Sequence, residues 1–208
     1  MENAKHHWDT IYTTRQPHEL SWWQDIPKPS LEILHKLHLS NSARIIDVGG
    51  GDSTFVDSLL HEGFSDITVL DISARSIERG KARLGPASQK IHWIVSDVLT
   101  FRPPSGYDVW HDRAMFHFLT SEEQISAYRD TLRDSINENG YIIIGTFSPH
   151  GPKRCSGLPT RQYDAEDLKL ALGNEYNEIY SFTVDHITPA GLTQNFQFCC
   201  FQKIRILP

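Results

Sequence analysis

The segment 43–56, Ala-Arg-Ile-Ile-Asp-Val-Gly-Gly-Gly-Asp-Ser-Thr-Phe-Val, constrains the fold more than any other part of the chain. The apolar residues of 45–48 are typical of a central parallel strand that is covered on both faces. The three glycines at 49–51 can adopt positive φ and leave no Cβ between the backbone and a ligand. Ser53 or Thr54 can cap a following helix, whose free N–H groups favour polar or anionic groups. Together, the strand, turn and helix predict a cofactor site.

The same alternation of strand and helix continues along the chain. Helical segments are expected at 53–62, from Ser73 to about Leu84, and from Ser121 onward. Two alternating segments at the end, joined by the turn 188–191, predict a hairpin whose last strand runs antiparallel. These features predict a doubly wound α/β sheet of seven strands, mostly parallel with an antiparallel C-terminal strand. The strands are expected at 43–48, 67–71, 90–95, 107–111, 141–147, 175–186 and 192–205.

We expect a single domain over 1–208, with a core at 41–208 and a distinct N-terminal region at 1–40. Trp8 and Tyr12 are four residues apart and therefore share one helical face. Two interpretations stay open for this region: a helix packed at the edge of the domain, or a helical lid and substrate region over a cleft. A leucine pattern that starts at Ser30 predicts a second amphipathic helix, with Ser30 as its cap.

Composition narrows the setting and the partners. The net charge is −6, and no basic run stands out, so a nucleic-acid partner is not expected. No apolar run approaches membrane-spanning length, and the N-terminus has no signal-peptide core. The three cysteines do not have the number or spacing of a disulfide framework, which favours a reducing, cytoplasmic setting. Cys199 and Cys200 are adjacent in a predicted strand and point to opposite faces, and no metal site is expected.

Acidic residues follow three successive strands on the predicted sheet. In such sheets, ligands bind beyond the carboxyl ends of the strands, so these acids and the glycine turn share one rim. Asp71 is suited to accept hydrogen bonds from two ribose hydroxyls, because a carboxylate has two acceptor oxygens. Asp97 is placed to meet an adenine amino group, and Asp47 can orient the glycine turn or accept from an ammonium. The combination predicts an adenosine-containing cofactor.

Two features count against a dinucleotide. The dinucleotide fingerprint is Gly-x-Gly-x-x-Gly, and Thr54 stands at its third glycine position. The chain also ends in a hairpin where a dinucleotide-binding protein has a second mononucleotide-binding half. A cofactor without a pyrophosphate does not require the full glycine fingerprint in this turn.

These motifs resemble those of the class I S-adenosylmethionine-dependent methyltransferases, whose fold is Rossmann-like, from about Ser42 to the C-terminus. The family motif Asp-x-Gly-x-Gly-x-Gly falls on residues 47–53, with Ser53 in place of the last glycine. More narrowly, 110–119 and 155–159 resemble an uncharacterised bacterial branch, and 7–12 is similar to protein-lysine methyltransferases. The resemblance implies S-adenosylmethionine, with S-adenosylhomocysteine as product. It implies cofactor contacts from Asp47, Gly49, Gly50, Gly51, Ser53, Asp71, Ile72, Asp97, Val98 and His111.

Polar residues at the end of the fourth strand are the candidates for contact with the methyl acceptor. His111 or His117 is expected to take a proton near neutral pH if the acceptor must lose one. Asp112 can hold an acceptor ammonium, and Arg113 can clamp a carboxylate or pair with Asp112. For either histidine, a packing role is the competing interpretation. Further candidates in the long loop 148–163 are Cys155, Arg161 and Tyr163, although Cys155 has no identifiable base and is expected to be a small packed residue.

The resulting prediction is transfer of a methyl group to a small molecule or to a protein side chain. Two alternatives remain: a non-catalytic module that binds S-adenosylmethionine and regulates a partner, and an NAD(P)-binding reductase. The sequence predicts neither the acceptor nor the oligomeric state, because this architecture hosts many chemistries.

Overall fold

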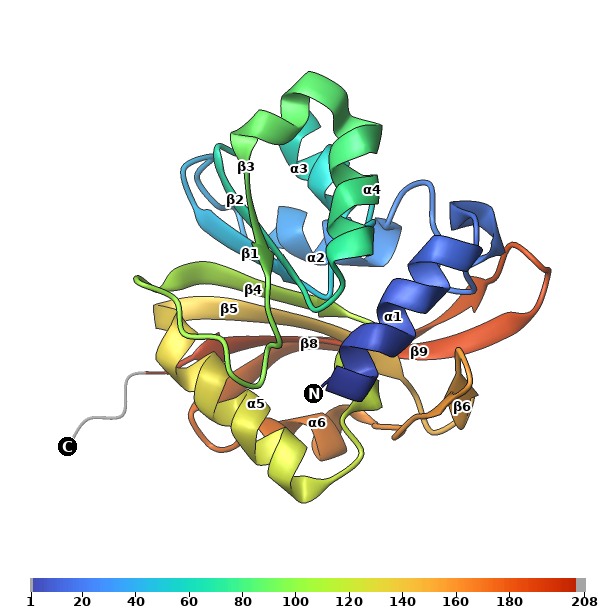
Figure 1. The fold of residues 1–208 in the computed structure, drawn as a ribbon. Helices are drawn as coiled ribbons and strands as arrows, with labels where there is room; N and C mark the ends of the chain where they lie inside the picture. Colours follow the sequence, from blue (N-terminus) through green and yellow to red (C-terminus); the bar gives the residue numbers. More distant parts are fainter. Residues whose placement is uncertain (1, 205–208) are drawn as a thin grey trace.

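The computed structural model describes residues 2–204. Its centre is a seven-stranded sheet in the order β3-β2-β1-β4-β5-β9-β8 (Figure 1). β9 (Thr193–Lys203) runs antiparallel to both of its neighbours, β5 and β8 (Tyr176–Ile187). The predicted sheet, mostly parallel with an antiparallel C-terminal strand, is therefore confirmed. The first five strands, parallel to one another, are β1 (Arg44–Val48), β2 (Asp66–Asp71), β3 (Ile91–Val95), β4 (Tyr107–Arg113) and β5 (Ile136–Phe147).

Helices cover both faces of this sheet (Figure 1). The helices on one face are α2 (Lys28–Lys36), α3 (Phe55–His61) and α4 (Ala74–Leu84). Those on the other are α5 (Glu122–Ser135) and α6 (Ala165–Leu172). Two apolar cores result, because successive side chains of a strand point to opposite faces. Ile45 and Ile46 lie in different cores, and so do Cys199 and Cys200, as predicted.

Helix starts and stops mostly follow the predicted signals. Ser73 caps α4 by accepting from the Ser76 amide, and Ser121 caps α5 by accepting from the Gln124 amide. The cap predicted at Ser30 is wrong, because α2 begins at Lys28, directly after Pro27. Ser30 therefore lies inside the helix, fully buried against the sheet.

Two strands are longer than predicted. β4 continues past residue 111 to Arg113, so the last three residues of this strand alternate between the faces of the sheet. β5 begins at Ile136, and its pairing with β4 is interrupted around Asn139, which has a positive φ of 63°. The first change decides which polar groups reach the binding cavity.

The N-terminal residues form α1 (Glu2–Thr14) and a short turn, η1 (Pro17–Glu19). α1 lies beside α4, where Asp9 accepts from the Ser73 hydroxyl at 2.7 Å and Arg79 donates to the carbonyls of Tyr12 and Arg15. The remaining short elements are η2 (Gly85–Lys90), η3 (Phe116–Phe118) and the hairpin of β6 (Arg154–Cys155) with β7 (Leu158–Pro159). Among residues 2–204, none of the helices combines the length and hydropathy that a membrane crossing requires.

Candidate active site

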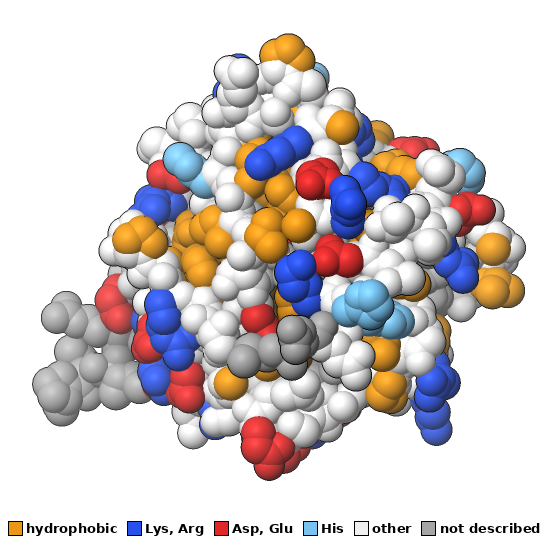
Figure 2. Space-filling model, viewed as in Figure 1, with side chains coloured by type: hydrophobic (Ala, Val, Ile, Leu, Met, Phe, Trp, Pro, Cys, Tyr) orange, Lys and Arg blue, Asp and Glu red, His pale blue; other side chains and the backbone are white. Residues whose placement is uncertain are grey.

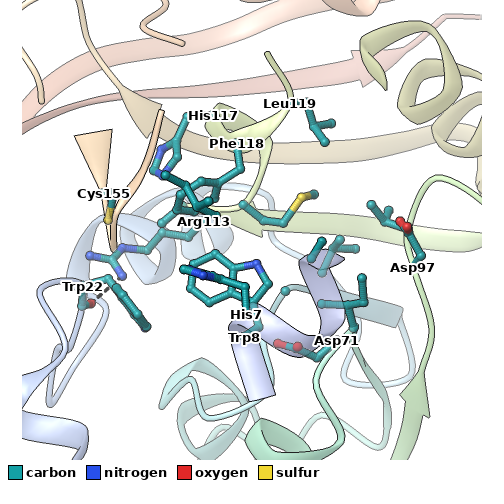
Figure 3. A pocket seen from close by; sticks show the side chains of 18 of the residues that line it. His7, Trp8, Trp22, Asp71, Asp97, Arg113, His117, Phe118, Leu119 and Cys155 are labelled. Atoms are coloured by element: carbon teal, nitrogen blue, oxygen red, sulfur yellow. Dashed lines mark hydrogen bonds between the residues drawn. The ribbon is translucent and has the colours of Figure 1, made fainter. Parts of the chain in front are cut away.

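A cavity of about 640 Å³ lies beyond the carboxyl ends of β1, β2 and β4 (Figure 3). This is the position expected for a ligand of a doubly wound sheet, and the volume is typical of a small-molecule site. Asp71 and Asp97 lie on one side, and His117, Arg113 and Cys155 lie on the other. What we call the acidic half is lined by Gly49, Asp71, Ile72, Asp97 and Val98. What we call the aromatic half is lined by Trp8, Trp22, Arg113, His117, Phe147 and Phe196.

The glycine turn has the shape that a close ligand requires. Gly49 lines the cavity with a φ of 68°, a conformation that L side chains rarely adopt, and its amide donates to the Leu70 carbonyl at 2.7 Å. A Cβ on Gly51 would overlap the Ser76 hydroxyl and lie 2.6 Å from Asp71 Oδ2. The turn can therefore lie against Asp71 only if position 51 carries no side chain.

Arginines from α4 hold the outer part of this turn in place. Arg83 donates to the carbonyls of Asp52 and Ser53, at 2.9 and 2.8 Å, and pairs with the Asp52 carboxylate at 2.7 Å. Arg79 pairs with the other oxygen of Asp52 at 2.8 Å. Ser53, predicted to contact the cofactor, accepts from the Phe55 amide and lies outside the large cavity. Gly50 and Ser53 line a separate, much smaller cavity beside Asp47.

Asp71, at the end of β2, is the most perturbed acid of the cavity. Its side chain is 6% exposed, and it accepts from the Ser73 amide at 2.7 Å. Burial raises the pKa of Asp71 to about 7, and the charge of Asp47 adds to the effect. A buried carboxylate at the cavity wall is well placed to accept from ligand hydroxyls.

Asp97 and Val98 lie beyond the end of β3, across the acidic half from the glycine turn. The Leu99 amide donates to Asp97 Oδ1 at 2.9 Å, which fixes the carboxylate at the cavity wall. Val98 is buried at the same wall, and Ile72 follows Asp71. The structure thus brings together the acids that the sequence places on successive strand ends.

Asp47 and His111 form a buried chain with Ser30 of α2. His111 Nδ1 lies 2.6 Å from Asp47 Oδ1, and its Nε2 lies 2.8 Å from the Ser30 hydroxyl. The ring of Phe55 stacks on the imidazole at 4.0 Å between centroids. His111 and Asp47 do not line the large cavity, so the geometry does not support the predicted contact of His111 with cofactor or acceptor. Asp47 Oδ2 lies beneath Gly50 and has no hydrogen-bond partner among the described residues.

Asp112 points to the opposite face of β4, into the core beneath α5. Its Oδ2 accepts from the Tyr128 hydroxyl at 2.9 Å, and that hydroxyl accepts from Trp110 Nε1 at 2.8 Å. Its Oδ1 accepts from the amides of Met115 and Phe116. Burial raises the pKa of Asp112 to about 6, while these donors oppose the shift. Asp112 does not reach the cavity, so its geometry does not support the predicted contact with an acceptor ammonium or the pairing with Arg113.

His117 reaches the aromatic half but cannot readily be protonated there. It is fully buried, stacks on Phe147 at 4.2 Å, and neither ring nitrogen has a hydrogen-bond partner within residues 2–204. Burial, and then the charge of Arg113, lower the pKa of His117 to about 3. Its predicted role as proton acceptor near neutral pH is therefore not supported, whereas a neutral imidazole still offers one donor and one acceptor.

Arg113 carries the charge of the aromatic half. Its Nη1 donates to the Trp22 carbonyl at 2.8 Å, and its guanidinium lies 5.2 Å from the centre of the Phe196 ring. Burial lowers the pKa of Arg113 to about 10, which leaves it charged at neutral pH. Trp22 and Phe196 were not predicted as site residues, and neither was Gln194, which also lines the cavity.

Of the candidates in the long loop 148–163, one lines the cavity and two do not. Cys155 lines the cavity as a buried thiol, 3.7 Å from the Ser21 hydroxyl, and burial raises its pKa, in keeping with a packed residue. Arg161 pairs with Glu122, and Tyr163 is buried in the core; neither lines the cavity. Across the described part of the chain, no group of three or more His, Cys, Asp or Glu side chains is arranged to hold a metal ion.

Comparison with known proteins accounts for this arrangement. Residues 46–142 match a family model described as a methyltransferase domain, and this range contains the glycine turn, Asp71, Asp97 and Arg113. The chain contains a methyltransferase domain. The matched range ends inside β5, so much of the aromatic half lies outside it.

Two curated relatives extend the similarity of this methyltransferase. A malonyl-[acyl-carrier protein] O-methyltransferase of Anoxybacillus flavithermus is 29% identical over 125 residues, which are 59% of this chain and 46% of the relative. The chain thus spans about half the length of that protein. An EEF1A lysine methyltransferase 2 of Danio rerio is 28% identical over 162 residues, 68% of this chain and 67% of the relative.

Solved structures share the whole fold at lower identity. The N-methyltransferase NodS of Bradyrhizobium japonicum, in complex with S-adenosylhomocysteine, superimposes with a TM-score of 0.73 at 16% identity. The similarity covers 98% of this chain and 100% of that one. The likeness therefore includes α1 and the C-terminal hairpin, and at this identity it concerns the fold alone.

Proposed function

We propose that this methyltransferase binds S-adenosylmethionine in the acidic half of the cavity and methylates a small molecule in the aromatic half. The observation that carries the proposal is the division of one cavity into two chemically different halves (Figure 3). One half offers carboxylates and a glycine turn, and the other offers aromatic rings and one cation. A cofactor-binding regulatory module would need only the first.

The residues of the acidic half fit the cofactor. Asp71 can accept from the ribose hydroxyls, and Gly49 lines the same half of the cavity. Asp97 is placed to accept from the adenine amino group, and Ile72 and Val98 provide apolar contacts beside it. Asp47 Oδ2 lies against Gly50 of the turn, and the absence of a side chain at Gly51 allows the turn to approach Asp71 closely. When bound, S-adenosylmethionine supplies an activated methyl group, so the protein mainly has to position the acceptor and exclude water.

A small acceptor is favoured over a protein lysine by the charge of the aromatic half. A lysine substrate approaches as a cation, and the acids that line the cavity, Asp71 and Asp97, both lie in the other half. The cation there is Arg113, which would repel an ammonium. α1 and the β6–β7 hairpin also contribute to the walls, through Trp8 and Cys155, so the chain itself encloses the acceptor.

Long nucleic acids are not expected as acceptors. Figure 2 shows basic and acidic side chains interspersed over the viewed face, and the net charge of the chain is −6. A polyanion needs a continuous basic surface. The three free, buried cysteines support a cytoplasmic setting.

Binding and labelling experiments test the proposal. Calorimetry is expected to show micromolar binding of S-adenosylhomocysteine and no comparable binding of NADH. Isotope from methyl-labelled S-adenosylmethionine, added with a cell extract, is expected in the small-molecule fraction. Label only in the protein fraction would refute the small acceptor, binding without transfer would support a regulatory module, and preferential NADH binding would support a reductase.

A further inference from the structure

Arg113 is a cation without an acidic partner. Within residues 2–204 no carboxylate lies within ion-pair distance of its guanidinium, and its Nε has no hydrogen-bond partner. Within the described residues, the one hydrogen bond of its side chain runs from Nη1 to the Trp22 carbonyl. Against the effect of burial, the charge of Asp47 raises the pKa of Arg113, but the two side chains form no ion pair: Asp47 Oδ1 is bonded to His111, and Asp47 Oδ2 has no hydrogen-bond partner within residues 2–204. A cation removed from water in this way is costly unless another group compensates it.

The walls around Arg113 are aromatic. Trp8 meets the rings of Trp22 and Phe118 edge-on, with centroids 5.8 and 5.0 Å apart. Phe147 and Phe196 also pack edge to face, with centroids 4.9 Å apart. Aromatic rings favour offset or edge contacts with other rings, so such walls suit a planar ligand.

Two further side chains, His117 and Gln194, bring unpaired polar atoms to this half. Within residues 2–204, both ring nitrogens of His117 lack a hydrogen-bond partner, and so does Gln194 Oε1. His117 is fully buried, and Gln194 is 9% exposed. Buried polar groups are normally bonded, so a ligand or water must complete them. An acceptor that carries both donor and acceptor atoms beside its ring would do so.

From these observations we infer that the acceptor is a small, planar aromatic acid whose anionic group pairs with the Arg113 guanidinium. The inference rests on the proposed function, because only that function makes the bound acid a methyl acceptor. The binding preference itself requires only the aromatic half. Arg113 then selects anions over neutral or cationic molecules of the same shape, and the neutral His117 and Gln194 orient the ring.

A set of three probes with one ring system tests this preference directly: naphthoate, naphthamide and naphthylmethylamine, which are anionic, neutral and cationic at neutral pH. Each is titrated into the full chain saturated with S-adenosylhomocysteine, by calorimetry. We expect naphthoate to bind about 10- to 100-fold more tightly than naphthamide, because the amide offers the guanidinium one neutral carbonyl oxygen in place of a charged carboxylate with two acceptor oxygens. Naphthylmethylamine is expected to bind more weakly still.

Three variants locate the cause. Arg113→Met is expected to abolish the preference for naphthoate, and Arg113→Lys is expected to keep part of it, because the charge remains. Arg133→Gln is the control: it removes an exposed arginine that pairs with Asp130 on α5, outside the cavity, and should leave the preference intact. The affinity of each variant for S-adenosylhomocysteine reports whether the acidic half is still folded.

Specific outcomes overturn the inference. Equal binding of the three probes, preference for the amine, an unchanged preference in Arg113→Met, or failure of naphthoate to bind would each do so. Failure of the proposed function has a different signature, namely absence of S-adenosylhomocysteine binding by the unsubstituted chain. In that case the same probes are titrated into the ligand-free chain, where the ratio of naphthoate to naphthamide affinity still tests the role of Arg113.

Discussion

Binding of the ribose should depend on pH between 6 and 8, because Asp71 titrates in this range. Burial raises its pKa to about 7 in the ligand-free protein. Ribose hydroxyls donate hydrogen bonds, and the ionised carboxylate can accept two of them. In the protonated acid, one oxygen carries a hydrogen and is itself a donor, so it no longer accepts well from a hydroxyl. The ligand should therefore bind the ionised form and shift the equilibrium toward it.

The size of the effect follows from the population of that form. The apparent dissociation constant equals the intrinsic one divided by the competent fraction, so a group with a pKa near 7 gives about tenfold weaker binding at pH 6 than at pH 8. A carboxylate with an ordinary pKa near 4 would be fully ionised at both pH values, and the affinity would not change. The two cases differ clearly.

Adenosine is the appropriate ligand, because it carries the ribose and adenine without the titratable amino acid of the full cofactor. Its affinity is measured by calorimetry at pH 6, 7 and 8 for the unsubstituted chain, Asp71→Asn and Asp97→Asn. Asp71→Asn should bind weakly at every pH, and Asp97→Asn should bind more weakly while keeping the slope. A flat profile for the unsubstituted chain would refute the assignment of the ribose to Asp71.

The raised pKa of Asp71 also has a consequence for stability. The native state holds this proton more tightly than the unfolded state, so the contribution of Asp71 to the free energy of unfolding falls as pH rises from about 4 to about 7. Relative to the unsubstituted chain, Asp71→Asn should therefore be more stable at pH 8 than at pH 5. Denaturant titrations at the two pH values measure the difference.

Three further substitutions test the framework of the site. Gly51→Ala should lower the unfolding free energy by about 1–3 kcal/mol and weaken S-adenosylhomocysteine binding, since its Cβ would overlap the Ser76 hydroxyl; an unchanged affinity would show that the turn tolerates a side chain. Tyr128→Phe leaves Trp110 Nε1 and Asp112 Oδ2 unpaired, and denaturant unfolding should show a loss of about 1–3 kcal/mol. Asp9→Ala removes the bond from the Ser73 hydroxyl to α1, and stopped-flow measurements should show about 2- to 10-fold faster release of S-adenosylhomocysteine. Unchanged release would mean that α1 does not control this step.

Much of the acidic half could be predicted from the sequence, because its signals are local. Strand, glycine turn and helix are adjacent in the chain, and the topology of a doubly wound sheet brings Asp71 and Asp97 to the same rim. The caps at Ser73 and Ser121 also follow from neighbouring residues. Such features need no knowledge of how distant segments pack.

The fourth strand shows where this reasoning fails. A strand that ended at His111 would leave the next residues free to face the ligand together. Because β4 continues to Arg113, His111 and Asp112 point into opposite cores. Periodicity does not fix strand ends to within two residues, and here those residues decide which groups meet the cavity.

Most residues of the aromatic half could not be predicted from the sequence, for a different reason. Trp22 is far along the chain from Gln194 and Phe196 of β9, and no local pattern links these two segments. The perturbed pKa of His117 likewise results from its burial against Phe147. Only the composition of the N-terminal region, rich in tryptophan and tyrosine, hinted that it takes part.

The division of the cavity bears on how relatives of this protein should be read. The stretch 46–142 supplies the acidic half, whereas Trp8, Trp22, Phe147 and Phe196 come from before and after it. Substitutions in those flanking segments can change the shape and the lining of the aromatic half without altering the turn at Gly49. Two chains that agree over 46–142 therefore share Arg113 and its charge but can differ in the ring system that they accept, and the flanking segments are the place to look for that difference.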